Sequence, residues 1–388
     1  QKIQRIVANA NLNVKENGRT KSIRLQRKRK IKGGMEYVYQ LPLGLSVKQM
    51  EDHRHLLEDG LNVRQVISWE EIKKLKLDKT ILQQIKRLFR QEKAQKEVVI
   101  DFDGMLRIRV YEQSLPKSIE WQEDMTAKKW AVPVGFNRDG LIYHDFEKRP
   151  HIVVAGTTGY GKSQYLKLLI TTLIQEQPDN VHFSLVDLKG GTAFYRFKDL
   201  KQVNGVAKNP EEAKEMLTQV QEQMEERLSE VVHGGFEDVQ EAGIKDRHFI
   251  IVDEAADLDK PSLEIVTDIA RRGRAAGVRL VYATQYPTNE TLPSQVRQNI
   301  GGRISFVLET TAASLATLDE KGAEDLPEIP GRAIYKRVKK EVVQCPYITN
   351  DQIKEQIALH INIRGRDDEH PNTTSTANRE HSLIIEDA

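Results

Sequence analysis

The chain has 388 residues, and its 59 Lys and Arg almost balance its 57 Asp and Glu, which gives a formal net charge of +2. This length can hold two domains, one of them with a sizeable α/β core. The single cysteine, Cys345, excludes an internal disulfide, fits a reducing compartment and is expected to be a small buried residue. No signal peptide is visible, and no apolar run approaches the roughly 18 residues that a bilayer span needs.

The first 32 residues stand out by charge. Eight Lys and Arg and no acid lie between Arg19 and Lys32, whereas the region 185–360 is rich in Glu and Asp. We interpret 1–32 as a polar, basic N-terminal arm with weak structure. Such an arm suits contacts with phosphates and with an anionic membrane surface equally well.

Residues 33–112 are predicted to form a small α+β module. The alternation in 35–41 indicates a strand, and helices are expected to begin at Ser46 and at the capping-box pattern 68–71. Residues 98–102 and 105–111, joined by Asp-Gly, indicate a β-hairpin. The apolar residues expected to face inward from the two helices are Val47, Met50, Leu57 and Leu61, and then Ile81, Ile85, Leu88 and Phe89.

The region 113–350 alternates strand and helix patterns after a short β-rich segment at 133–145. The expected buried strands are 182–187, 248–253, 278–284 and 303–308, and Asn209-Pro210 opens a long helix. This order predicts an α/β domain whose mostly parallel sheet has helices on both faces. The remaining segment, 351–388, is predicted to be mostly a disordered tail, from about Arg364 onward.

A complete phosphate-binding loop follows an apolar strand that begins at His151. Its G-x-x-x-x-G-K-S pattern leads into an apolar helical stretch, which is the strand–loop–helix context that the motif requires. Glycines let successive backbone N–H groups point at one anion, and the helix N-terminus adds partial positive charge. The predicted nucleotide-binding residues are Gly156, Thr157, Thr158, Gly159, Tyr160, Gly161, Lys162 and Ser163. Lys162 can reach the β- and γ-phosphates of ATP, and the Ser163 hydroxyl can complete the shell of Mg²⁺.

Two acids end the apolar strand 249–252, about ninety residues after the loop. Asp253 is predicted to hold Mg²⁺ through water, and Glu254 to polarise the attacking water. The doublet favours a hydrolase, since a pure switch would not need the second acid. Gln285, at the end of the strand 281–284, could sense the γ-phosphate or position water.

Other charged residues admit two interpretations. Asp187 and Lys189 could line the nucleotide cleft or bear on the substrate, or they could serve only the turn after their strand. Arg274 and Arg303 are candidates for an arginine that reaches the triphosphate of a neighbouring subunit in a ring.

Several segments together resemble the FtsK/SpoIIIE family of DNA-pumping motor ATPases. The resemblance covers roughly residues 130–348, and it is carried by 151–163, 251–257, 274–285, 302–306, 322–326 and 330–333. It implies a RecA-like fold, a homo-hexameric ring, and translocation of double-stranded DNA without sequence specificity. It also implies that the 33–112 module corresponds to the small α/β domain that precedes the motor in this family.

The chain departs from the chromosome-segregation members, which end in a winged-helix module, because only about forty residues follow the motor. It resembles more closely the coupling proteins of Gram-positive conjugative elements, which bring a relaxase-bound DNA to a membrane channel. The expected location is therefore the cytoplasmic face of the cell membrane, with an anchor upstream of Gln1. Conjugation moves one strand whereas the family implies duplex, so the cargo stays open between single- and double-stranded DNA.

Three other functions are compatible with parts of this pattern. A protein-export ATPase of the type VII kind shares these motifs, but such chains usually carry several motors and degenerate loops. A chromosome-segregation pump and a nucleotide-dependent factor that binds DNA without pumping it are further alternatives, and the intact Glu254 counts against the last. Arg297, in the 286–301 loop, is a guess for a pore-lining residue.

Overall fold

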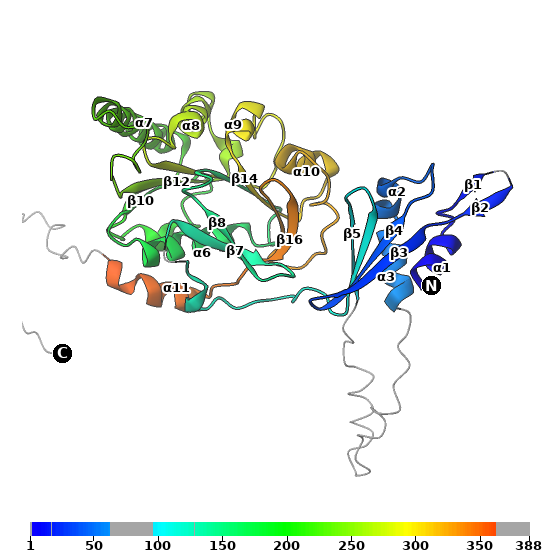
Figure 1. Cartoon of the computed structure of the whole chain (residues 1–388). Helices are drawn as coiled ribbons and strands as arrows, with labels where there is room; N and C mark the ends of the chain where they lie inside the picture. The colour runs from blue at the N-terminus through cyan, green and yellow to red at the C-terminus, as the bar shows by residue number, and fades with distance from the viewer. Residues whose placement is uncertain (1, 17, 63–95, 128, 362–388) are drawn as a thin grey trace, which may run out of the picture.

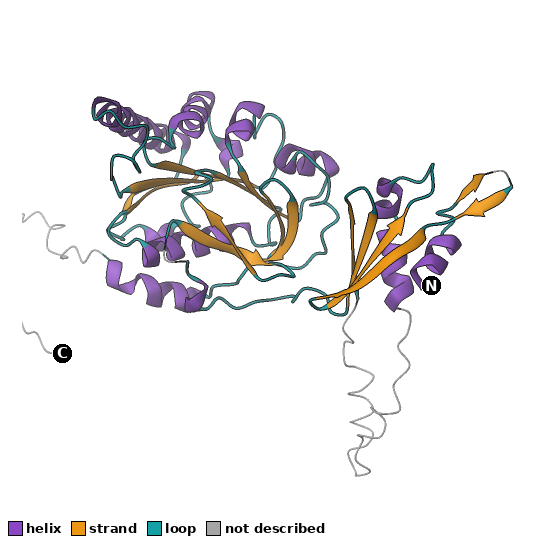
Figure 2. Cartoon of the chain, viewed as in Figure 1, coloured by secondary structure: helices purple, strands orange, loops and turns teal. Residues whose placement is uncertain are grey.

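The computed structural model describes residues 2–16, 18–62, 96–127 and 129–361. These form a large body of sheet and helices and a smaller body built from the N-terminal part of the chain (Figure 1). Figure 2 shows that both bodies combine strands with helices. The predicted α/β class, with a small α+β module ahead of a mostly parallel sheet, is confirmed.

The large body is organised around a ten-stranded sheet of order β11-β10-β12-β13-β9-β14-β15-β16-β7-β8. The first six strands of this order are mutually parallel, and the last four extend the sheet with antiparallel pairing. The parallel strands are β9 (Ile152–Ala155), β10 (Val181–Asp187), β11 (Val203–Ala207), β12 (Arg247–Asp253), β13 (Val278–Thr284) and β14 (Gly302–Phe306). The antiparallel strands are β7 (Ala131–Phe136), β8 (Leu141–Asp145), β15 (Arg332–Lys336) and β16 (Lys340–Gln344).

Helices cover both faces of this sheet. One face packs against α6 (Lys162–Glu176) and α11 (Asn350–Ile357), and the other against α7 (Pro210–His233), α8 (Lys260–Arg272) and α9 (Ser294–Asn299) (Figure 1). Strands that are apolar along their whole length are buried on both sides, which is typical of parallel sheets. The helix α10 (Thr311–Leu318) lies beside β14 in a smaller cluster.

The start of α7 follows from its sequence. The Asn209 side chain accepts a hydrogen bond from the Glu212 backbone N–H at 2.9 Å, and Pro210 occupies the first turn. Ala213, Leu217, Val220, Met224 and Val231 are buried on one side of the helix. The predicted helix opening at Asn209-Pro210 is confirmed.

The N-terminal body is a four-stranded antiparallel sheet of order β3-β4-β6-β5, packed against three short helices. Its elements are α1 (Lys2–Asn9), β3 (Arg24–Ile31), β4 (Gly34–Gln40), α2 (Val47–Asp52), α3 (Arg54–Asn62), β5 (Glu97–Phe102) and β6 (Leu106–Tyr111), and a separate ribbon joins β1 (Val14–Glu16) to β2 (Arg19–Lys21). The strand at 35–41 and the 98–111 hairpin are confirmed.

The expectation of weak structure in the 1–32 arm is wrong. Its basic run forms β3, which pairs along its length with β4, and the apolar residues Ile3, Val7 and Ile23 are buried in the core of the N-terminal body. A run of cations does not oppose strand formation at a sheet edge, because long charged side chains can extend into solvent there.

Two further differences concern helices and the C-terminus. The helix expected from Ser46 is divided at His53 into α2 and α3, and Ser46 caps α2 in a capping box with Gln49. Within 351–388, α11 is ordered against α6, with Ile353 and Ile357 in the core. The expected helix over 68–89 and the tail from Arg364 lie outside the described residues. Among the helices that the structure describes, none combines the length and apolar character needed to cross a bilayer.

Two arginines join the bodies. Arg332 of β15 is buried and donates to the carbonyl oxygens of Leu115 and Pro116 at 3.1 and 2.9 Å, and so fastens the connecting segment to the sheet. Arg138, in the β7–β8 turn, pairs with Glu97 of β5 and stacks over the Tyr111 ring at 4.4 Å. The beginning of the connecting segment and the adjoining strands β5 and β6 are therefore held against the large body.

Two buried histidines make stability depend on pH. Burial lowers the pKa of both His144 and His151 from 6.5 to about 3. Between these values only the unfolded chain binds the protons, so the free energy of unfolding should fall as pH falls below 6.5, by about 2 kcal/mol per histidine at pH 5. Urea unfolding at pH 7.5 and 5 measures this. The variant His151→Asn can still accept a hydrogen bond from the Leu280 N–H, and its free energy of unfolding should fall by about 2 kcal/mol less between the two pH values. An unchanged pH dependence would contradict the lowered pKa of His151.

Candidate active site

The phosphate-binding loop lies at the edge of the sheet where the parallel strands end. It joins β9 to α6, and the N-cap of α6 is Gly161, so no side chain caps the first N–H groups of the helix. Gly161 has φ 121°, and a Cβ there would lie 3.1 Å from the Phe306 ring and 3.2 Å from the Gly331 nitrogen. Only glycine fits this position, and the loop thereby leaves its backbone donors available to a phosphate.

Lys162 and the two acids meet in a buried group. The ammonium group of Lys162 is ion-paired with Asp253 Oδ1 and lies 3.9 Å from Glu254 Oε2. All three side chains are at most 8% exposed. Asp253 ends β12, which pairs with β13, and β13 pairs in turn with β9. The strand β13 therefore lies between β9, which leads into the phosphate-binding loop, and β12, which carries the acids. Lys162 contacts both acids across this strand.

The donor set fits ATP with Mg²⁺. Magnesium sites at nucleotides commonly use one or two protein oxygens together with the phosphates. Asp253 and the Ser163 hydroxyl, on the first turn of α6, are the residues that would hold the ion. No cluster of three or more His, Cys, Asp or Glu that could hold a metal occurs among the described residues.

Glu254 is held in an unusual conformation at the centre of the site. Its backbone is left-handed, with φ 61° and ψ 56°, which costs a non-glycine residue on the order of 1–2 kcal/mol. Its Oε1 accepts hydrogen bonds from Thr284 Oγ1 at 3.2 Å and the Gln285 backbone N–H at 3.1 Å. The carboxylate is therefore aimed by the end of the neighbouring strand β13. Sequence reasoning missed Thr284.

Lys189 contacts the same carboxylate from the other side. Its Nζ lies 3.1 Å from Glu254 Oε2, an ion pair without hydrogen-bond alignment, and its side chain is 46% exposed. Asp187 instead accepts from the backbone N–H groups of Lys189 and Ala193 at 3.0 and 2.7 Å. Asp187 therefore stabilises the turn that follows its strand, whereas Lys189 contacts the catalytic group.

We expect Lys189→Met to raise the ATP turnover measured without any activator. An ion pair with one partly exposed partner is worth up to about 1 kcal/mol, so releasing Glu254 to orient water should raise the basal kcat about fivefold. Steady-state hydrolysis measures it, with Lys208→Met, at an exposed lysine beyond β11, as the matched control. A lowered kcat would mean that Lys189 aligns Glu254 rather than restrains it.

Gln285 lies against the phosphate-binding loop. Its Oε1 accepts a hydrogen bond from the Thr158 hydroxyl at 2.7 Å. Because β13 runs between β9 and β12, the residue at its end stands between the loop and the acids. The structure thus brings Lys162, Asp253, Glu254 and Gln285 together at one edge; their individual roles stay predictions.

The candidate arginines lie elsewhere. Arg274 is exposed just before β13 begins, at the opposite edge of the sheet, and no ion pair involves it within the described part of the chain. Arg303 is tied down by Asp319 and by the carbonyls of Thr317 and Arg297 at 3.3 and 3.1 Å. Neither reaches the phosphate-binding loop of its own chain, so a role in a neighbouring subunit's site stays a prediction, and Arg274 is the freer of the two.

Arg297 is held as well. It donates to the Ala316 carbonyl at 3.1 Å and lies 3.8 Å from Asp319, with its side chain 17% exposed. These contacts give it a structural role in joining α9 to α10, and they do not favour the pore-lining role.

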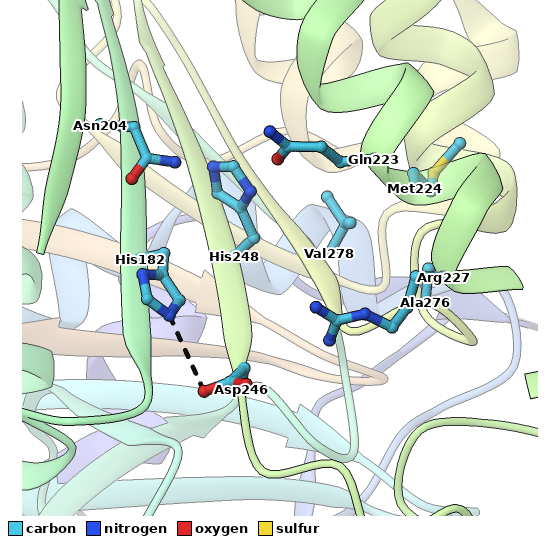
Figure 3. A pocket seen from close by; sticks show the side chains of 9 residues that line it. All are labelled: His182, Asn204, Gln223, Met224, Arg227, Asp246, His248, Ala276 and Val278. Carbon is cyan, nitrogen blue, oxygen red and sulfur yellow. Dashed lines mark ion pairs between the residues drawn. The ribbon is translucent and has the colours of Figure 1, made fainter. Parts of the chain in front are cut away.

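A pocket of about 190 Å³ opens at the edge where the parallel strands begin, beside α7. His182 and His248 line it from the strands and Gln223 and Arg227 from the helix, and His182 faces Asp246 at 3.7 Å (Figure 3). Asp187 and Asp253 lie at the opposite, C-terminal ends of the same two strands, at the sheet edge that carries the phosphate-binding loop. The pocket is therefore separate from the catalytic group.

The sheet order, the loop on α6 and the buried acids one strand away define a P-loop ATPase. A family model described as the FtsK/SpoIIIE family matches residues 114–332, more than half of the chain. The chain belongs to this family.

Relatives in sequence share the motor region. The DNA translocase FtsK of Chlorobaculum tepidum is 29% identical over 263 residues, which cover 61% of this chain and 33% of that protein. The FtsK of Streptomyces coelicolor is 32% identical over 222 residues, covering 50% of this chain and 24% of that protein. The chain thus spans about a quarter to a third of the length of these curated relatives.

Solved structures share the fold. The pCW3 conjugation coupling protein TcpA, determined as a monomer form with ATPγS, matches with a TM-score of 0.61 and 21% identity, covering 92% of this chain and 98% of that one. The cytoplasmic domain of the Thermomonospora curvata type VII secretion ATPase EccC matches with a TM-score of 0.55 and 23% identity, covering 64% and 33%.

Proposed function

We propose that this chain is the motor part of an ATP-driven DNA translocase that acts as a coupling protein in conjugative transfer. In this proposal six copies form a ring that moves DNA toward a membrane channel. The DNA arrives in a complex with a relaxase, and a segment upstream of Gln1 anchors the ring at the cytoplasmic face of the membrane. The observation that carries the motor function is the intact group of Lys162, Asp253 and Glu254 at one sheet edge.

The chemistry follows from these residues. Lys162 exchanges its pairing with Asp253 for the β- and γ-phosphates of ATP, and Asp253 and Ser163 are then available to magnesium, which when bound neutralises phosphate charge. Glu254, aimed by Thr284 and the Gln285 N–H, orients the attacking water. Arg274 of a neighbouring copy completes the site, and ring loops that shift with nucleotide state grip the DNA backbone.

The extent of the structural match supports a coupling protein over the alternatives. The match to TcpA extends over almost the whole of both chains, whereas EccC matches 64% of this chain, and the FtsK relatives align over 50 to 61%. A type VII-like export ATPase and a chromosome-segregation pump are therefore the competing functions that an experiment has to separate.

Steady-state ATP hydrolysis with double-stranded DNA, single-stranded DNA or an unfolded acidic peptide, at two salt concentrations, tests the proposal. We expect DNA to stimulate turnover, with the stimulation weakened by salt. The more effective form of DNA identifies the cargo. Stimulation by the peptide and not by DNA would overturn the proposal in favour of protein export.

A further inference from the structure

The outer edge of the N-terminal sheet carries a row of cations that the motor chemistry does not use. β3 is an edge strand, paired only with β4. It contains Arg24, Arg27, Lys28, Arg29 and Lys30, which we call the basic edge; all five are exposed, and the strand has no acid. The six residue-to-residue steps from Arg24 to Lys30 span about 20 Å.

Most cations of the basic edge form no ion pair with the described part of the chain. Arg29 is paired with Glu36 at 2.6 Å, but no ion pair involves Arg24, Arg27, Lys28 or Lys30 in the part of the chain that the structure describes. The nearby acids are engaged by other arginines, since Glu36 of β4 also binds Arg109 at 3.1 Å, and Asp103, in the turn between β5 and β6, binds Arg107 at 2.5 Å. Burial would raise the pKa of Glu36, but the hydrogen bonds from Arg29 and Arg109 lower it overall. This carboxylate thus stays ionised and fixes Arg29 in place.

Protection of the sheet edge does not account for the sign of the charge. Charged side chains on an edge strand, lysines especially, prevent pairing with other chains, yet three of the five cations of β3 are arginines. The opposite edge strand, β5, carries Glu97 and Asp101 and no cation. The two edges therefore have opposite charge, and the concentration of cations on β3 points to an anionic partner.

We propose that the basic edge binds the phosphate backbone of DNA outside the motor ring; this inference rests on the proposed DNA-translocating function. Duplex DNA carries a charge about every 1.7 Å of axis, so a 20 Å strand edge can meet several phosphates at once, with Arg27 and Arg29 on one face of the sheet and Lys28 and Lys30 on the other. Three of the five cations are arginines, whose planar group suits phosphate. A membrane surface is less suited, because stable interfacial binding combines cations with exposed apolar residues, and every exposed side chain of β3 is polar.

The test uses the full chain with Arg27→Gln, Lys28→Gln and Lys30→Gln combined, and a fluorescent duplex without sequence preference. We expect the affinity to fall roughly tenfold or more at 50 mM salt, and the slope of log K against log salt to become shallower by about 2 to 3. The charge-conserving exchange Arg27→Lys, Lys28→Arg and Lys30→Arg should retain binding. The matched control replaces three exposed lysines outside the basic edge by glutamine: Lys214, Lys245 and Lys260.

The outcomes separate this inference from the proposed function. If DNA stimulates the ATPase of the parent chain and the triple variant keeps its affinity and salt slope, the basic edge does not bind DNA. The inference also fails if the matched control loses as much affinity. If the variant instead loses binding to phosphatidylglycerol vesicles while its DNA affinity is unchanged, the partner is a membrane. Absence of DNA stimulation in the parent would count against the proposed function itself. The double variant Arg27→Gln/Lys30→Gln replaces the triple variant if the latter melts early.

Discussion

Replacing Glu254 by glutamine should lower ATP turnover roughly 10²- to 10³-fold while ATP binding is retained. Glutamine has nearly the same shape and can still accept the hydrogen bonds from Thr284 and the Gln285 N–H, so the left-handed backbone at this residue should persist. What is lost is the carboxylate that orients water and attracts its proton. Single-turnover hydrolysis, together with the amount of unhydrolysed ATP that stays with the protein after gel filtration, measures both parts.

The control for this variant is Glu290→Gln, at an exposed acid in the loop that follows Gln285. It should leave turnover unchanged, since it lies beyond the hydrogen bonds that fix the catalytic carboxylate. Equal turnover by Glu254→Gln and the parent chain would contradict the role of Glu254 as the water-orienting group.

Replacing Lys162 by alanine should abolish ATP binding and should also destabilise the protein without nucleotide. Lys162 is the buried partner of Asp253, and removal of one member of a buried ion pair leaves an uncompensated charge, at a cost of about 3–5 kcal/mol. We expect a lower melting temperature in the absence of ATP and no rise when ATP and Mg²⁺ are added. The parent chain should show that rise.

The double variant Lys162→Ala/Asp253→Asn separates the two effects. Neutralising the acid removes the buried charge, so the melting temperature should recover much of its loss, but ATP should still fail to bind. A double variant that melts as early as Lys162→Ala alone would show that the lysine stabilises the fold by packing rather than by pairing with Asp253.

The catalytic group could largely be predicted because its signals are local. A glycine loop between an apolar strand and an apolar helix, and two acids at the end of another apolar strand, each fit within a few consecutive residues. The long parallel strands were equally clear, since burial on both faces leaves an uninterrupted apolar run.

The contacts made by Lys189 and Thr284 depend instead on the order of strands in the sheet. Both residues reach Glu254 because β10 and β13 flank β12, and no short pattern in the sequence encodes that neighbourhood. The same limit explains the error at the N-terminus. Charge alone suggested a solvated arm, whereas β3 is ordered by pairing with a strand that follows it and by a few apolar residues among the cations. The break between α2 and α3 likewise falls within one continuous helical pattern.

The connection through Gly331 and Arg332 has a mechanical consequence. Gly331 donates to the carbonyl of Tyr160, in the phosphate-binding loop, at 2.9 Å, and the next residue, Arg332, holds the carbonyls of Leu115 and Pro116. The phosphate-binding loop and the segment that leads to the N-terminal body are thus hydrogen-bonded to two consecutive residues. A displacement of the loop that preserves these hydrogen bonds would also displace the connecting segment, and movement caused by nucleotide binding would in this way be transmitted to the N-terminal body.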